Sequence, residues 1–155
     1  MDLAPRKPRL VLFGAGPIGQ AFAAQFALLP FQVEAYDARP NFSDHAVILT
    51  DAEMVEAAAC LEDGDYALIA THSHDVDYGV AAAILKAGRA RFVGMVGSRG
   101  KRDGMIARLA ADGFSEVIIA KLHCPVGIPG MKGKAPEMIA VSAAAQVLGF
   151  LDEDA

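Results

Sequence analysis

The chain has 155 residues, of which 54% are hydrophobic and 21% charged, and its formal net charge is −5 at pH 7. This size and composition predict one globular domain, residues 1–155, that needs neither a disulfide nor a metal to hold its core. The negative charge argues against a general nucleic-acid surface, and no unbroken apolar run approaches the ~20 residues that span a bilayer.

We expect residues 1–8 to form a flexible lead and residues 150–155 an acidic, solvated tail. The lead runs straight into a strand-like segment and lacks the pattern of a secretory signal peptide. The two cysteines, Cys60 and Cys124, form no CxxC motif. These features favour a cytoplasmic protein with reduced thiols.

Apolar runs alternate with segments of helical spacing along the chain. Residues 9–16 are expected to form a buried strand, and residues 17–29 a helix that begins with a proline. Further strands are predicted at 31–37, 45–50, 65–71, 91–98 and 116–122, with helices at 51–61, 76–88, 99–113 and 135–151. This alternation predicts a three-layer, Rossmann-like α/β fold, in which helices cover both faces of a doubly wound, mostly parallel sheet.

A glycine turn, Gly14-x-Gly16-x-x-Gly19, joins the first predicted strand to the first predicted helix. In dinucleotide-binding domains such glycines allow a tight turn, let a phosphate approach the backbone, and pack the helix against the strand. The helix N-terminus, which includes Ile18, adds N–H groups and a partial positive charge. Pro17 has no N–H, so one donor of the turn is missing. A turn kept only for packing is the alternative.

Asp37 ends the second predicted strand, where a ribose-binding acid belongs in this fold. An acid at this place favours NAD or another adenosine ligand over NADP. Because Arg39 follows two residues later, NADP stays an alternative ligand.

Histidines and aspartates follow the fourth predicted strand, and open α/β sheets gather ligands at the carboxyl ends of their strands. His72 is therefore a candidate cofactor-binding residue. An alternative is a zinc or iron site built from His72, His74 and Asp77. The simpler interpretation is that Thr71 or Ser73 caps the next helix, with the acids favouring its dipole.

Ser98, Arg99 and Lys101 lie at the start of the predicted helix 99–113. Basic residues in a first turn oppose the helix dipole, so we expect them to face an anion. Arg99 can hold a phosphate or carboxylate with two hydrogen bonds, and Lys101 can act as a point charge. An ordinary solvated basic turn is the alternative.

The segment 121–137 combines His123 and Cys124 with a glycine-rich loop that carries Lys132 and Lys134. Its spacing does not fit a P-loop. A neighbouring imidazolium and lysines would lower the pKa of the Cys124 thiol and make it a nucleophile or soft-metal ligand. A simply buried cysteine is the alternative.

Five segments occur in an order that resembles a known family: VLFGAGPIGQAF, YDARPNF, ATHSHDVDY, FVGMVGSRGKR and LHCPVGIPGMKGKAPEMIAVSAAAQVL. They are similar to the C-terminal Rossmann domain of the xanthine dehydrogenase accessory proteins, the XdhC/CoxF maturation-factor family. The likeness covers nearly all of residues 9–149. Members of the family usually carry a separate N-terminal domain, so the chain is expected to be a short form, a split protein or a piece of a longer one.

The resemblance implies a chaperone for the molybdenum cofactor rather than an ordinary enzyme. Such a protein binds molybdopterin, lets a cysteine desulfurase provide the terminal sulfur ligand, and passes the cofactor to apo-xanthine dehydrogenase. Neither a nucleic acid nor a membrane is an expected partner, and a homodimer stays open.

The candidate cofactor-binding residues are Gly14, Gly16, Ile18, Gly19, Asp37, His72, Ser98, Arg99, Lys101, Cys124 and Lys134. No nucleophile, base and orienting group can be recognised together, so catalytic residues are not assigned. The alternative functions are an NAD(P)-binding oxidoreductase and a nucleotide-sensing binding module.

Overall fold

The computed structural model describes residues 6–151, and within this range six strands form one parallel sheet. The strands are β1 (Arg9–Phe13), β2 (Gln32–Asp37), β3 (Val47–Ile48), β4 (Tyr66–Ile69), β5 (Phe92–Met95) and β6 (Leu122–His123). The helices are α1 (Pro17–Phe26), α2 (Asp51–Ala59), α3 (His74–Ala87), α4 (Arg99–Ala111), α5 (Glu116–Ile119) and α6 (Pro136–Leu148), and a 3-10 turn covers Pro40–Phe42.

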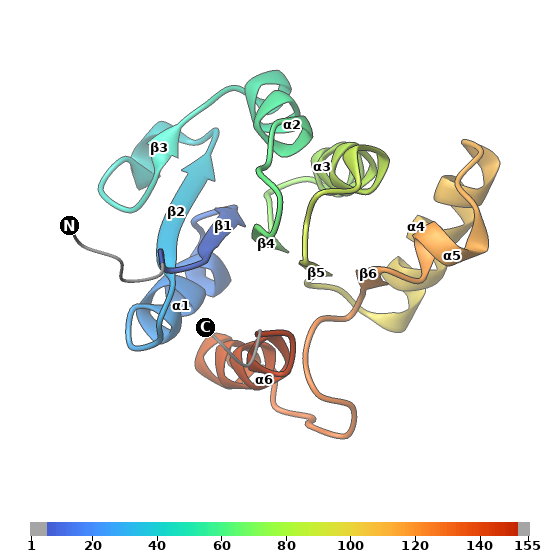
Figure 1. The fold of residues 1–155 in the computed structure, drawn as a ribbon. Coiled ribbons are helices and arrows are strands. Elements are labelled where there is room, and N and C mark those ends of the chain that lie inside the picture. Colours follow the sequence, from blue (N-terminus) through green and yellow to red (C-terminus); the bar gives the residue numbers. More distant parts are fainter. Residues whose placement is uncertain (1–5, 152–155) are drawn as a thin grey trace.

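The sheet is buried on both faces, which explains why its central strands are continuous apolar runs. Side chains alternate along β1, so that Val11 and Phe13 enter one hydrophobic cluster while Leu10 and Leu12 enter the other. The first cluster includes residues of α2, α3 and α4, and the second includes residues of α1 and α6. Figure 1 shows α2 and α3 on one side of the strands and α1 and α6 on the other.

The strand order β3-β2-β1-β4-β5-β6 is that of a doubly wound sheet. The chain leaves β1 through α1 to build β2 and β3 on one side, and then returns through α2 to place β4 on the other side of β1. The loops that follow β1 and β4 therefore diverge. This switch point is where open α/β sheets bind their ligands.

The predicted fold class is confirmed, and one predicted strand is wrong. Residues Glu116–Ile119 form the short helix α5, and the sixth strand, Leu122–His123, begins only after it. The hydroxyl of Ser115 accepts a hydrogen bond from the N–H of Ile118, which caps this helix. An apolar run this short has no period that separates strand from helix.

Several element boundaries also differ from prediction, including those of one strand and one helix. The strand expected at 45–50 is reduced to Val47–Ile48, at the edge of the sheet. The helix expected from residue 76 begins at His74, because Ser73 caps it two residues earlier.

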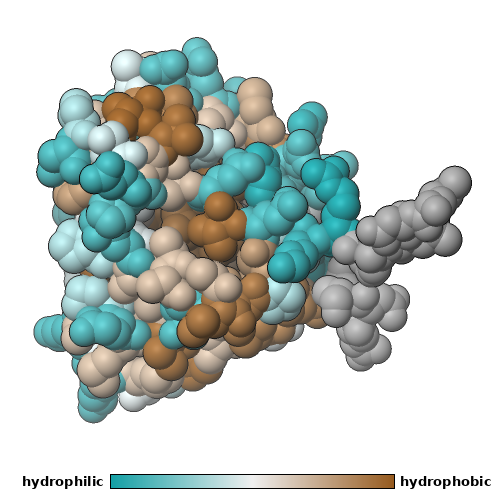
Figure 2. Space-filling model, turned by 90° about the vertical axis from the view of Figure 1, so that its left-hand side faces the viewer, coloured by the Kyte–Doolittle hydropathy of each residue, from teal (hydrophilic) through white to brown (hydrophobic). Residues whose placement is uncertain are grey.

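Figure 2 shows the molecule from the side that lies to the left in Figure 1, where hydrophobic residues form several groups separated by hydrophilic ones.

The predicted lead and tail fall largely on residues 1–5 and 152–155, which lie outside the described residues. Residues near both ends of the described range contact the rest of the domain. The carbonyl of Pro8 accepts a hydrogen bond from the N–H of Gln32, and Phe150 packs edge-on against Phe92, with ring centroids 5.1 Å apart. Phe150 and Leu151 are thus partly buried and pack against the second hydrophobic cluster. No helix within residues 6–151 is long and apolar enough to cross a membrane.

Candidate functional site

A crevice of about 280 Å³ lies at the carboxyl ends of β1 and β4, at the switch point of the sheet. Its walls come from the glycine turn, from the loop after β4 and from three residues of other segments. They are Gly16, Pro17, Ile18 and Gly19; Ala70, Thr71, His72, His74 and Asp77; and Arg39, Val96 and Lys101. Of the predicted cofactor-binding residues, Gly16, Ile18, Gly19, His72 and Lys101 meet here.

The three glycines of the turn have different tasks. Gly14 has φ +118°, and a Cβ there would lie 2.0 Å from the carbonyl oxygen of Ala70. A Cβ on Gly19 would lie 2.0 Å from the carbonyl oxygen of Gly14, so both glycines serve close packing. Gly16 differs, because its Cβ would meet only the guanidinium of Arg39, at 3.3 Å. Gly16 is the glycine that opens the backbone to the crevice.

The N-terminus of α1 faces this crevice without a side-chain cap. Hydroxyl groups cap four other helices: Thr50 caps α2, Ser73 caps α3, Ser98 caps α4 and Ser115 caps α5. The cap position of α1 is Gly16, and Pro17 follows it. The N–H groups of Ile18 and Gly19, in the first turn, therefore have no partner in the helix or its cap and point to where an anion can bind.

The carboxylate of Asp37 already accepts hydrogen bonds from other residues of the protein, whereas the prediction was an acid open to ribose. Its side chain is 1% exposed and accepts hydrogen bonds from the N–H of Ala15 at 2.7 Å and of Arg39 at 2.8 Å. The guanidinium of Arg39 adds two more, from Nε at 2.9 Å and from Nη2 at 2.8 Å. Burial opposes ionisation of Asp37, but these hydrogen bonds outweigh it and lower the pKa to about 2.

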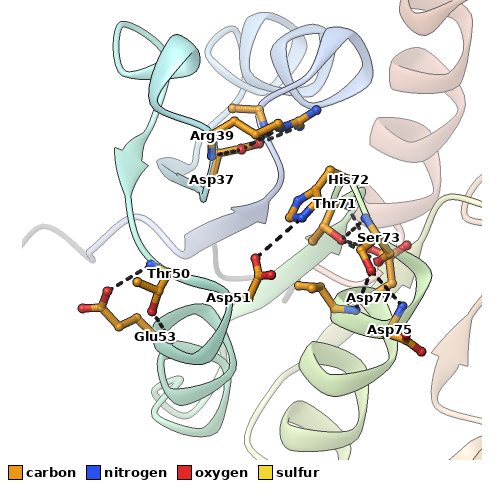
Figure 3. A network of polar contacts seen from close by, with 12 residues as sticks. Asp37, Arg39, Thr50, Asp51, Glu53, Thr71, His72, Ser73, Asp75 and Asp77 are labelled. Carbon is orange, nitrogen blue, oxygen red and sulfur yellow. Dashed lines mark hydrogen bonds and ion pairs between the residues drawn. The ribbon is translucent and has the colours of Figure 1, made fainter.

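Arg39 lines the crevice although it was not among the predicted cofactor-binding residues. The guanidinium carbon lies 4.5 Å from the centre of the Phe42 ring, and one third of the side chain is exposed, 33%. Figure 3 shows Asp37 and Arg39 side by side at the end of β2. The fixed cation lines the crevice next to Gly16.

Lys101 and Asp77 form an ion pair that is almost completely buried. Lys101 Nζ lies 2.6 Å from Asp77 Oδ2 and donates to the carbonyl of Val96 at 2.7 Å. The other carboxylate oxygen, Oδ1, accepts from the hydroxyl and the N–H of Thr71 at 2.6 and 2.9 Å. Asp77 is therefore an internal partner of the β4 loop and of Lys101, and not an acid that merely complements the α3 dipole.

The two histidines lie at the rim of the crevice. His72 Nε2 is 3.7 Å from Asp51 Oδ1 at the start of α2 (Figure 3), and His74 is the first residue of α3. The predicted capping by Ser73 is confirmed, since its hydroxyl accepts from the N–H groups of Asp75 and Val76. The alternative metal site is not assembled: residues 6–151 contain no group of three or more His, Cys, Asp or Glu side chains able to hold a metal ion.

Six predicted residues do not line the crevice: Gly14, Asp37, Ser98, Arg99, Cys124 and Lys134. The Ser98 hydroxyl accepts from the N–H of Lys101 and so acts as a helix cap. Arg99 lines a separate hollow formed by the loop 125–133, and Lys134 lines a further hollow of about 430 Å³. The Lys134 hollow shares Val96 with the crevice, so the two depressions adjoin.

Cys124 belongs to the first hydrophobic cluster and lines none of these depressions. Burial raises the pKa of its thiol, although the positive charges of Lys101 and Arg102 oppose this. The neighbouring His123 points to the opposite cluster and stacks on Phe92 at 4.7 Å, and burial lowers its pKa. The expected lowering of the thiol pKa is therefore wrong.

The strand order, the glycine turn and the switch-point crevice define a Rossmann-type domain. The model of the XdhC Rossmann domain family matches residues 10–147. The chain thus belongs to the XdhC Rossmann domain family, and the resemblance noted in the sequence is confirmed.

Two similar proteins are longer than this chain. YqeB of Escherichia coli (strain K12), described as an uncharacterized protein, is 33% identical over 150 residues, which cover 92% of this chain and 27% of YqeB. The crystal structure of BH1974 from Bacillus halodurans, described as a xanthine dehydrogenase, superposes with a TM-score of 0.76 and 25% identity. That match covers 93% of this chain and 42% of BH1974, so the chain spans less than half the length of either relative.

Proposed function

We propose that this domain binds the molybdenum cofactor in the switch-point crevice and delivers it to apo-xanthine dehydrogenase-type enzymes. The proposal places the domain in the cytoplasm, working with a cysteine desulfurase that sulfurates the bound cofactor. Family membership supports this role, as does the superposition on BH1974, a protein described as a xanthine dehydrogenase. The observation that carries the proposal is the pair of fixed cationic side chains, Arg39 and Lys101, beside the open glycine turn.

The donor set of the crevice fits the phosphate group of molybdopterin. Gly16 leaves the backbone uncovered, and the first-turn N–H groups of Ile18 and Gly19 can donate to an anion. Arg39 and Lys101 are each already held by a carboxylate, so their remaining N–H groups can donate to an anion while binding orders few side chains. When bound, the cofactor supplies a molybdenum–dithiolene centre, and these residues orient it by its phosphate end.

The oxidoreductase alternative has less support from this geometry. In NAD-dependent Rossmann domains the acid at the end of the second strand accepts hydrogen bonds from the ribose hydroxyls. Here Asp37 is buried and its oxygens already accept from Ala15 and Arg39. A ribose can reach that carboxylate only if Arg39 is displaced.

Anaerobic calorimetric titration of the purified chain with molybdenum cofactor tests the binding step. The blocking variant is Gly16→Leu, because Gly16 has φ −71°, which any residue adopts, and its side chain would fill the crevice. The matched control is Gly104→Ala on α4, where a Cβ meets no atom within 4 Å. We expect wild type and Gly104→Ala to bind equally and Gly16→Leu to lose about tenfold or more in affinity.

A transfer assay tests the delivery step. Chain loaded with cofactor is mixed with apo-xanthine dehydrogenase, with and without a cysteine desulfurase, and enzyme activity is followed against an equal amount of free cofactor. If xanthine dehydrogenase activity recovers faster with the loaded chain than with free cofactor, the proposal is supported. Absence of cofactor binding by the wild type, or equal binding by Gly16→Leu, contradicts it.

A further inference from the structure

Arg39 is fixed in place before any ligand arrives. Nε and Nη2 of its guanidinium donate to the two oxygens of Asp37, at 2.9 and 2.8 Å. Its other support is the ring of Phe42, whose centre is 4.5 Å from the guanidinium carbon. A two-bond pair with a stacked ring holds the plane of the guanidinium, so little rotational freedom is left to lose on binding.

The remaining donors of Arg39 face the glycine turn. Asp37 takes the N–H of Nε and one N–H of Nη2, which leaves both N–H groups of Nη1 and one of Nη2. No residue within 6–151 accepts a hydrogen bond from these groups. Nη2 and Nη1 lie 3.3 and 3.9 Å from the Cβ position of Gly16, so both nitrogens stand over the open part of the turn.

This arrangement changes what the crevice can recognise. A neutral ribose diol needs the acceptor that Asp37 would offer, and Arg39 covers that acceptor. A bridging diphosphate relies on the N–H groups of the turn, and Pro17 removes one of them. A terminal phosphate, with a charge of about −1.5 to −2 at pH 7, instead matches a free guanidinium edge and the nearby first-turn N–H groups.

We infer that the crevice selects its ligand by a terminal phosphate monoester, held between Arg39 and the Gly16 turn, and rejects dinucleotides that offer only a ribose diol there. The inference rests on the proposed function for the site and deepens it by naming the chemical group that is recognised. Molybdopterin carries this group, and so do adenosine nucleotides with a 2′-phosphate. Arg39 is then the residue that sets specificity, and Asp37 is the residue that positions it.

Parallel calorimetric titrations test this selection with anaerobic molybdenum cofactor, adenosine 2′,5′-bisphosphate, NADP, NAD and adenosine. We expect wild type to bind at least one phosphate monoester about tenfold or more tightly than NAD or adenosine. Arg39→Ala should lose that preference, and its binding of NAD should strengthen because Asp37 becomes free to accept ribose hydroxyls. Arg102→Ala, an exposed arginine on α4, is the matched control and should bind like wild type.

A second variant guards against a folding defect, because Arg39→Ala leaves the buried Asp37 carboxylate without its cation. Arg39→Lys keeps the positive charge and removes the planar fork, so it should fold and show an intermediate loss of phosphate affinity. Thermal melts of each variant establish that the titrated proteins are folded.

The outcomes separate this inference from the proposed function. Cofactor binding that neither Arg39→Ala nor Arg39→Lys weakens overturns the inference and leaves the proposed function standing. Arginine-dependent binding of adenosine 2′,5′-bisphosphate without any cofactor binding keeps the inference and overturns the proposed function. Equal binding of NAD and the phosphate monoesters by wild type overturns the inference. If wild type binds none of the ligands, both the inference and the proposed function are overturned.

Discussion

Lys101 and Asp77 link the first turns of two neighbouring helices, with Lys101 Nζ 2.6 Å from Asp77 Oδ2. Each helix follows one of two adjacent strands, α3 after β4 and α4 after β5. A lysine in a first turn opposes the dipole of its own helix, and here a carboxylate from the next helix compensates it. The anion that the sequence led us to expect near Lys101 is therefore, at least in part, supplied by the protein.

Removing the lysine should destabilise the domain strongly. In Lys101→Met the Asp77 carboxylate, 1% exposed, would be buried without a cation, and we expect a loss of about 3–5 kcal/mol in the free energy of unfolding. Urea denaturation measures the loss. The double variant Asp77→Asn, Lys101→Met should recover most of it, because no unpaired charge is left. A single variant as stable as wild type would contradict this account of the pair.

The acid stability of the domain should depend on Asp37. The pKa of Asp37 is about 2 in the folded protein, against an ordinary value of 3.8, so the folded state binds this proton less readily than the unfolded state. The carboxylate therefore contributes roughly 2 kcal/mol above about pH 4, and this contribution is lost as pH falls towards 2. Urea unfolding at several pH values between 6 and 2 should show a shallower decline in Asp37→Asn than in wild type.

Tyr78 should ionise later than an ordinary tyrosine. Burial, a hydrogen bond from its hydroxyl to Asp112 and the negative charge of Asp112 raise the pKa of Tyr78 to about 12, while Arg108 opposes the shift. Because the folded state keeps this proton longer, Tyr78 lends stability that is present below pH ~10 and is lost as pH rises towards 12. Ultraviolet titration should show a late tyrosinate phase that Tyr78→Phe removes and Asp112→Asn moves to lower pH.

The two cysteines should differ widely in reactivity. Cys60 is exposed, whereas Cys124 is buried with a raised thiol pKa, so less thiolate is available at neutral pH. A chromogenic thiol reagent should modify Cys60 quickly and Cys124 only when the protein unfolds. Cys60→Ser should abolish the fast phase. A fast phase that survives in Cys60→Ser would mean that Cys124 is reached in the folded state.

Glycine substitutions should have opposite effects at two positions. Gly14→Ala places a methyl group 2.0 Å from the carbonyl oxygen of Ala70 at φ +118°, so we expect a loss of about 3 kcal/mol or more. Gly104→Ala lies in the middle of α4 with open space around it, and should raise stability by about 0.5–1 kcal/mol. Thermal and urea unfolding check both values, and destabilisation by Gly104→Ala would contradict the second.

Periodicity and turn signals were enough to predict a parallel sheet and the glycine turn after its first strand, because they are local properties of the sequence, but they misplaced the sixth strand. The role of Asp37 was not predictable in this way. Its position at the end of β2 follows from the pattern, but the guanidinium of Arg39 covers the carboxylate, and the 3-10 turn Pro40–Phe42 places the Phe42 ring against that guanidinium. Such a contact depends on backbone geometry that residue types alone do not specify.

The environment of Cys124 was mispredicted for a related reason. His123 and Cys124 are adjacent in sequence, but successive side chains at the end of a strand point to opposite faces of the sheet. His123 therefore lies against Phe92 and Phe150, and Cys124 enters the cluster beneath α3 and α4. Alternation along the strand could have separated the two residues in advance.

The sheet topology also sets the order in which a growing chain can complete its fold. β1 lies between β2 and β4, so the central strand lacks one neighbour until residues up to Ile69 have been synthesised. α1 packs against α6, which begins only at Pro136, and Phe22 and Phe26 of α1 lie in the cluster that α6 helps to close. On the ribosome, the face of α1 that packs against α6 thus stays uncovered until α6 emerges, and the second hydrophobic cluster is completed only after β6 has been synthesised.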